Sequence, residues 1–118
     1  MIVTTAPILQ GYEVQYLGYV SVRNVRAINI FRDFFTSFRD VVGGRSQSYE
    51  SLMKNMEKEV LLELQKKAEE MQANAIIAVH VDFDNISSKG KSLIMCYANG
   101  TAVQARPNNV KIEKHKTM

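Results

Sequence analysis

The longest periodic segment of this chain is an amphipathic helical pattern over residues 48–72. Its apolar side chains recur every three or four positions, which places them on one face of a helix. They are Tyr49, Leu52, Met53, Met56, Val60, Leu64, Ala68 and Met71. Ser46 or Ser48 can cap the start of the helix, and Asn74 is expected to end it. A face of this length needs a second layer to cover it, which favours a two-layer fold.

Strand patterns lie on both sides of the helical part of the chain. Residues 2–5 form a short strand-like run, and residues 12–22 alternate with a period of two. In the longer strand this alternation predicts one apolar face, made of Tyr12, Val14, Tyr16, Gly18, Val20 and Val22. Residues 75–84 and 91–105 have the pattern of two further strands. In the first of these two, Ile77, Val79, Val81 and Phe83 are predicted to share one face.

A second helical pattern covers residues 27–42, where Phe-Arg-Asp occurs twice, seven residues apart. Its apolar stripe consists of Ile28, Phe31, Phe35, Phe38 and Val42, which predicts a tight seam against a helix or a sheet. Arg32 and Arg39 lie at the border of this stripe. We therefore expect a subunit interface made of Phe31, Arg32, Phe35, Phe38 and Arg39. Asp33 and Asp40 are about 10 Å apart on the helix, which suits general acid–base catalysis poorly.

The composition is that of one soluble domain. The chain has 118 residues, and none of its apolar runs approaches the roughly 20 residues that a membrane span needs. The N-terminus has neither a basic region nor a small-residue cleavage site, so we expect no secretory signal. The single Cys96 excludes an internal disulfide framework and suits a reducing cytoplasm. We expect one domain over residues 1–106, located in the cytoplasm, with no membrane partner.

The net charge of +3 comes from the C-terminal end of the chain. The excess of basic residues lies in residues 106–118, and the remainder of the chain is balanced. Residues 107–118 are therefore expected to be a basic, flexible tail. This tail has no aromatic residue on which a base could stack, so nucleic acid is not an expected partner.

The segment between the two helical patterns, Gly43-Gly44-Arg45-Ser46, is a candidate anion site. Two glycines are expected to stop the first helix, because glycine readily adopts the left-handed conformation of a helix C-terminus. Backbone N–H groups, the start of the next helix and Arg45 would together favour phosphate or carboxylate. The segment lacks the pattern of a phosphate-binding P-loop. A helix–turn–helix corner with a serine cap accounts for the same residues.

A candidate metal site lies on the strand over residues 75–84. His80, Asp82 and Asp84 share one face of it, at intervals of about 6.6 Å. Imidazole and carboxylate ligands suit zinc or a similar divalent ion. One strand supplies at most two converging side chains, so a complete site would need further ligands. Closed ring symmetry could supply them by bringing copies of one side chain together.

Cys96 is not expected to join these ligands. With a turn centred between Ser87 and Ser88, Cys96 lies opposite Val79, and the His80 side chain is on the other face of the sheet. The sequence therefore predicts that Cys96 is a small buried apolar residue.

Four segments of the chain, and the order in which they occur, resemble the YbjQ-like family of small bacterial proteins. The segments are MIVTT, INIFRDFFTSFRDVVGGRSQSYE, QANAIIAVHVDFD and NGTAVQ, and the resemblance covers residues 1–105. Family membership implies a dodecin-like subunit, in which a three-stranded antiparallel sheet packs with helices. It also implies a pentameric ring, in which extra short strands bridge subunits, and the family label is heavy-metal-binding.

The sequence departs from the family pattern at SVRNVRAINI, VHVDFD and MCYANG, where glycine and small residues are usual. His80 and Cys96 are not residues that the family pattern carries over. The resemblance therefore bears on the fold and the ring rather than on a site.

Together these features predict a non-enzymatic homo-oligomer whose main partner is itself. Its ligand would be a divalent metal ion or a small anion at a junction between subunits. The alternative is a scaffold without a small ligand, in which the ring and the basic tail bind another protein. An enzyme with a site between subunits is a third interpretation, but the sequence shows no Ser/His/Asp or Cys/His set to carry it.

Overall fold

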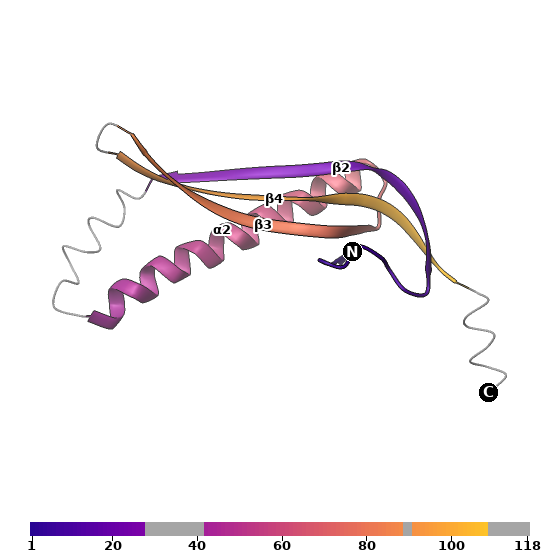
Figure 1. The fold of residues 1–118 in the computed structure, drawn as a ribbon, viewed down its shortest axis with the longest axis horizontal. Helices are drawn as coiled ribbons and strands as arrows, with labels where there is room; N and C mark the ends of the chain where they lie inside the picture. Colours follow the sequence, from indigo (N-terminus) through magenta and orange to yellow (C-terminus); the bar gives the residue numbers. More distant parts are fainter. Residues whose placement is uncertain (28–41, 89–90, 109–118) are drawn as a thin grey trace. The chain divides into compact units, whose positions relative to one another are not determined.

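The computed structural model describes residues 1–27, 42–88 and 91–108. Its elements are the strands β1 (Ile2–Val3) and β2 (Tyr12–Ala27), the helix α2 (Val42–Glu70), and the strands β3 (Ala75–Ser88) and β4 (Lys91–Pro107). The four strands form one sheet in the order β1-β3-β4-β2 (Figure 1). The predicted α+β class is therefore confirmed.

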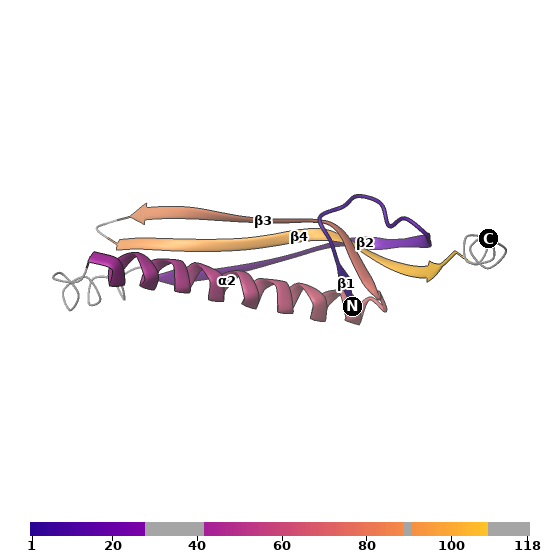
Figure 2. The ribbon, with the colours of Figure 1, turned by 90° about the horizontal axis from the view of Figure 1, so that it is seen from below.

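The sheet has one strand more than the three that the family resemblance implies, and this strand lies within the short strand predicted over residues 2–5. The additional strand is β1, which pairs in parallel with β3 and places Ile2 opposite Ala75 and Val3 opposite Ile76. The neighbouring strands β3 and β4 run in opposite directions (Figure 2). The sheet is therefore mixed rather than antiparallel, because the short N-terminal strand adds to the edge of β3.

The described elements group into two compact units. Of the described residues, unit 1 comprises 1–21, 64–80 and 99–108, and unit 2 comprises 22–27, 42–63, 81–88 and 91–98. Each unit contains a part of α2 together with parts of β2, β3 and β4. Each unit thus has helix and sheet from which to build its own core.

The helix α2 starts earlier than predicted, at Val42, and it includes Gly43 and Gly44. The prediction that these glycines end one helix and precede another is wrong here. A helical glycine costs only about 1 kcal/mol relative to alanine, which does not forbid it. The predicted helix over residues 27–42 otherwise lies outside the described residues. Within the described residues, no helix combines the length and the apolarity that crossing a bilayer requires.

The buried face of α2 repeats every four residues. Met56 and Val60 in unit 2, and Leu64 and Ala68 in unit 1, are each 0% exposed. Side chains at this spacing lie above one another on one face of the helix. The face predicted from the sequence is the face that the structure buries.

The helix ends in a left-handed cap at Gln72, which has a φ of 68°. The Gln72 N–H donates to the Glu69 carbonyl (2.8 Å), and the Ala73 N–H donates to the Ala68 carbonyl (3.0 Å). These two bonds are those of a Schellman motif, in which glycine is the usual left-handed residue. The chain uses glutamine instead, so this position carries backbone strain.

β4 covers the helix with small side chains. Its buried alternate positions are Ile94, Cys96 and Ala98 in unit 2 and Gly100 and Ala102 in unit 1. A Cβ atom at Gly100 would lie 2.8 Å from Ile76 Cγ2 and 3.1 Å from the Ile77 carbonyl oxygen. Those distances are too short for a real contact, so only glycine fits there without movement.

An irregularity in β3 changes which side chains face the helix. Ile76 and Val79 both approach the position of the absent Gly100 side chain, so they share a face although they are three residues apart. Ala78 lies between them with a φ of 52°, as expected at a β-bulge. The predicted grouping of Ile77 with Val79 is therefore wrong, because Ile77 packs on the opposite face with Val103.

A similar change occurs in β2 near Gly18, which has a φ of 148°. Val14 packs with the cluster around Val103, whereas a Cβ atom at Gly18 would lie 2.9 Å from Met71 Cε, next to the end of α2. Residues of even number therefore change face between these two points, which requires one extra residue in the strand. Tyr16, predicted to lie on the buried face, is consequently 70% exposed.

Unit 1 has a second apolar cluster, formed by Ala75, Ile77, Val103 and Ala105. Leu9 and Val14 pack against it. The segment that leads from β1 to β2 lies on the face of the strands away from α2 (Figure 2). The N-terminal segment thus covers a sheet face that the helix leaves open.

The strained cap yields a stability prediction. The substitution Gln72→Gly should raise the free energy of unfolding by about 0.5–1 kcal/mol, because glycine adopts a positive φ without steric cost. Urea denaturation of both proteins measures this difference. Gln72→Ala is the matched control, since it shortens the side chain but keeps the strain, and an equal gain from it would contradict the explanation.

Candidate functional site

The three predicted metal ligands occupy alternate positions of β3, and all three are exposed. His80 belongs to unit 1, whereas Asp82 and Asp84 belong to unit 2. Val81 and Phe83, which alternate with them, are half-buried. The predicted alternation is therefore present in this part of the strand, and metal binding stays a prediction.

The structure gives Asp82 a partner that the sequence analysis missed. Its Oδ2 atom accepts a hydrogen bond from the Tyr97 hydroxyl across the two strands (3.4 Å), and its Oδ1 atom accepts one from the Phe83 N–H (3.0 Å). Two donors on different oxygens hold the carboxylate in one orientation. The missed signal is the position of the β3–β4 turn, because that turn decides which residue of β4 lies across from Asp82.

Charge around Tyr97 keeps its hydroxyl protonated. The negative charge of Asp82 is the largest cause of the raised Tyr97 pKa, followed by burial and the hydrogen bond to Asp82. Asp84 adds to this effect, and the Arg23 guanidinium opposes it. Tyr97 is therefore a hydrogen-bond donor at neutral pH rather than a nucleophile or a base.

The turn between β3 and β4 differs from the predicted one. β3 extends through Ser88 and β4 begins at Lys91, so Ser87 and Ser88 are strand residues rather than the centre of the turn. The centre of the hairpin therefore lies two residues later than predicted, and the residue of β4 opposite a given residue of β3 changes by four. A period of two survives a shift of this size, because an even shift keeps every side chain on its face.

Cys96 is a buried residue, with 0% of its surface exposed, and its thiol is free. Burial is the main reason that its pKa rises from 9.0 to about 11, and the charge of Glu57 contributes. Heavy metals bind the thiolate rather than the thiol. The packing role predicted for Cys96 agrees with this environment.

Two other sets of residues were predicted from the sequence, one for anion binding and one for a subunit interface. Gly43, Gly44, Arg45 and Ser46 lie in the first turns of α2, where the leading N–H groups of a helix have no acceptor within it. Anion binding there stays a prediction. The predicted interface residues Phe31, Arg32, Phe35, Phe38 and Arg39 lie outside the described residues.

A polar contact between β2 and α2 in unit 2 was not predicted. The Arg26 guanidinium forms an ion pair with the Glu59 carboxylate (2.5 Å), and the Asn24 amide donates to the same carboxylate (2.7 Å). These bonds lower the Glu59 pKa from 4.5, the Arg26 bond most. The contact stabilises the fold at pH values above the ordinary carboxyl pKa of 4.5. Its contribution is lost as the pH falls below the lowered pKa and the carboxylate is protonated. Since both side chains are over one third exposed, its contribution is at most about 1 kcal/mol.

Residues 1–106 match a family model, named YbjQ_1, whose description is "Putative heavy-metal-binding". The chain is 44% identical over 107 residues to a UPF0145 protein of Trichodesmium erythraeum, covering 88% of this chain and 98% of that one. It is 41% identical over 107 residues to a UPF0145 protein of Pasteurella multocida, covering 90% of this chain and all of the relative. The resemblance to this family inferred from the sequence is confirmed.

A solved structure supports the fold. It is a protein of unknown function from Pediococcus pentosaceus that belongs to the DUF74 family. Its TM-score with this chain is 0.64 at 18% identity, and the match covers 90% of this chain and 98% of that one. At this identity the likeness concerns the fold alone.

The side chains of one copy do not fit a heavy-metal ion. The one cysteine is buried, and its raised pKa keeps the thiol protonated near neutral pH. Among the residues that the structure describes, no group of three or more His, Cys, Asp and Glu side chains could hold a metal ion. We therefore derive no chemistry through a heavy metal within one subunit.

The environment of Cys96 predicts that the native thiol reacts slowly. At pH 8, a rise in pKa from 9.0 to about 11 reduces the thiolate fraction about a hundredfold, and burial slows access further. Labelling with a chromogenic disulfide reagent, in buffer and in denaturing urea, measures both rates. The double variant Cys96→Ala/Asn55→Cys, with its thiol at an exposed position of α2, is the control and should react at once. Equal rates for native and unfolded Cys96 would contradict this account.

Proposed function

Because this chain belongs to the YbjQ-like family, we propose that it acts as a non-enzymatic, homo-oligomeric binding protein. The name UPF0145 of its relatives states no activity, which supports the non-enzymatic part of the proposal. The family resemblance implies a ring of five dodecin-like subunits, and we adopt that assembly. A free, buried cysteine suits a reducing cytoplasm, in which we place the protein.

The outer edge of β2 is the observation that carries the proposal. β2 is the last strand in the sheet order and has 16 residues, so a long strand edge faces away from β4. Such edges pair readily with a strand of another chain. Tyr16, Tyr19 and Val25 of this strand are 70%, 73% and 49% exposed. A second copy would both extend the sheet and cover these apolar side chains.

The segment over residues 27–42 is the second part of the proposed interface. Its stripe of Phe31, Phe35 and Phe38, bordered by Arg32 and Arg39, follows β2 directly in the sequence. Burying three phenylalanine side chains would contribute roughly 1.5–3 kcal/mol each. The arginines would then lie at the rim of the contact, where a carboxylate of the neighbouring copy can pair with them.

We place the ligand at a junction between copies. His80, Asp82 and Asp84 are exposed on β3, so a neighbouring copy can approach them. Ring symmetry repeats each side chain in every copy, and a divalent ion would gather one or two donors from each of several copies. A small anion at Gly43–Ser46 is the second ligand class, because helix N-termini attract negative charge.

Zinc and cadmium titrations of the assembled protein test the metal part of the proposal. The double variant His80→Ala/Asp82→Ala should bind either ion at least about tenfold more weakly than the unchanged protein, since it removes the donors. Calorimetry together with elemental analysis measures affinity and stoichiometry. The matched control is Lys66→Ala/Glu69→Ala, which removes two exposed side chains of α2 and should leave binding unchanged.

Two results would count against this site. Equal binding by the His80→Ala/Asp82→Ala variant would exclude these residues as ligands. Failure of the assembled, unchanged protein to bind either ion would refute the metal proposal. A phosphate titration of the unchanged protein and of the Arg45→Ala variant would then test the anion alternative.

A further inference from the structure

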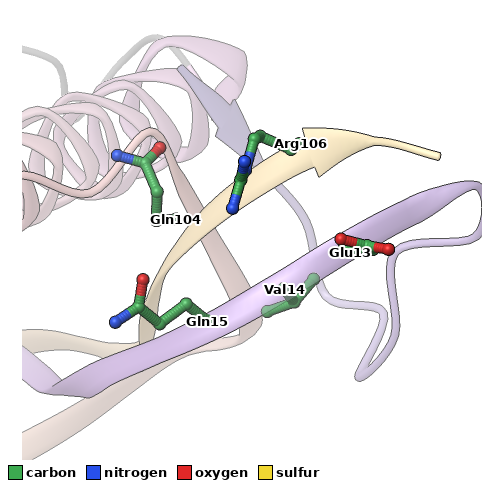
Figure 3. A pocket seen from close by; sticks show the side chains of 5 residues that line it. All are labelled: Glu13, Val14, Gln15, Gln104 and Arg106. Atoms are coloured by element: carbon green, nitrogen blue, oxygen red, sulfur yellow. The ribbon is translucent and has the colours of Figure 1, made fainter. Parts of the chain in front are cut away.

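A small pocket of about 110 Å³ lies in unit 1 on the neighbouring strands β2 and β4. It is lined by Glu13, Val14 and Gln15 from β2 and by Gln104 and Arg106 from β4 (Figure 3). A volume of this size holds several water molecules, and so admits a molecule the size of a small amino acid. None of these residues belongs to the sites considered above.

The strands hold the pocket residues in a fixed register. The side chain of Val14 alternates with those of Glu13 and Gln15 and packs in the apolar cluster with Val103 and Ala105. Along β4, Val103 and Ala105 alternate in turn with Gln104 and Arg106. A slip by one residue in either strand would expose the cluster, so burial on one face fixes which side chains line the pocket on the other.

Hydrogen bonds hold the backbone at both ends of the pocket. The Asn74 side chain bonds both backbone groups of Ala105: it accepts from the N–H at 2.7 Å and donates to the carbonyl at 2.8 Å. Further along, the Asn108 N–H donates to the Gly11 carbonyl at 2.7 Å. The backbone that carries the pocket is therefore held in place, which lowers the entropy cost of ordering it on binding.

The helix cap orients one side chain of the pocket. The Gln104 Nε2 group donates to the Gln72 carbonyl at 3.0 Å, at the left-handed residue that ends α2. With Nε2 engaged, Gln104 offers its Oε1 atom, an acceptor, to a bound molecule. Gln15 brings a second side-chain amide, with both donor and acceptor atoms.

The two charged groups of the pocket do not neutralise each other. In the described part of the chain the ion pair joins Arg26 and Glu59 in unit 2, and Glu13 and Arg106 form none. A guanidinium and a carboxylate therefore face one small space while separated from each other (Figure 3). A ligand that carries both charges would complement both groups at once.

We propose that this pocket binds a small zwitterion, namely a free α-amino acid with a short or polar side chain. Arg106 pairs with the ligand carboxylate through the bidentate geometry that guanidinium favours. Glu13 accepts from the ammonium group, as does the Oε1 atom of Gln104. Gln15 contacts the polar side chain of the ligand. This ligand is independent of the metal or anion proposed at the subunit junctions.

Ligand-observed NMR of the full chain with glycine, alanine, serine and glutamine at about 1 mM tests this proposal. At least one of them should bind, whereas acetate and methylammonium, which carry one charge each, should not. Arg106→Gln and Glu13→Gln should each weaken amino-acid binding by about tenfold or more, because each removes one charge-assisted contact. Both side chains are exposed, so neither change should impair folding.

The matched controls are Arg23→Gln and Glu63→Gln, which remove exposed charges in unit 2 and should leave binding unchanged. Three results would overturn the proposal. They are no binding by any of the four amino acids, equal binding of acetate alone, and full binding by the Arg106→Gln variant.

Discussion

The burial of one face of α2 together with one face of β4 is the constraint on which the rest of the structure depends. The buried helix positions repeat every four residues, and the buried alternate positions of β4 are mostly small residues. One of them is Gly100, where a Cβ atom would clash with Ile76 of β3. This packing places β4 at the centre of the sheet, between β3 and β2. It also buries Cys96, which removes the only thiol of the chain from metal chemistry. The left-handed cap that ends α2 then orients Gln104 in the pocket of unit 1.

The spacing of apolar residues, every second position in strands and every third or fourth in helices, predicted the class of the fold and most of its elements. The α2 face of Met56, Val60, Leu64 and Ala68 could be derived from the sequence, because a long amphipathic pattern has few alternatives. The two strand irregularities could not. A strict period of two does not reveal an inserted residue. Continued through Gly18 and Ala78, it predicts the wrong faces for Tyr16 and Ile77. Gly43 and Gly44 were predicted to end a helix, but they lie inside α2, because tertiary context can place glycine within a helix.

The candidate sites show the same limit. His80, Asp82 and Asp84 could be grouped because neighbouring positions of one strand are visible in the sequence. The pairing of Asp82 with Tyr97 could not, because it depends on where the β3–β4 turn falls. The pocket is harder still to predict, because Glu13 and Arg106 are distant in the sequence and no motif joins them. Only the neighbouring placement of β2 and β4 brings them to one space.

The edge of β2 connects the fold to the proposed function. The edge of β2 and its exposed tyrosines either remain in solvent or are covered by another copy. The second arrangement would pair the free backbone N–H and carbonyl groups of the edge and would also bury the apolar side chains. The central claim is therefore that the protein is a closed assembly of identical chains. Native mass spectrometry of the gently purified protein at micromolar concentration tests it most directly. The account predicts one dominant species with the mass of five chains, and a protein found only as a monomer would contradict it.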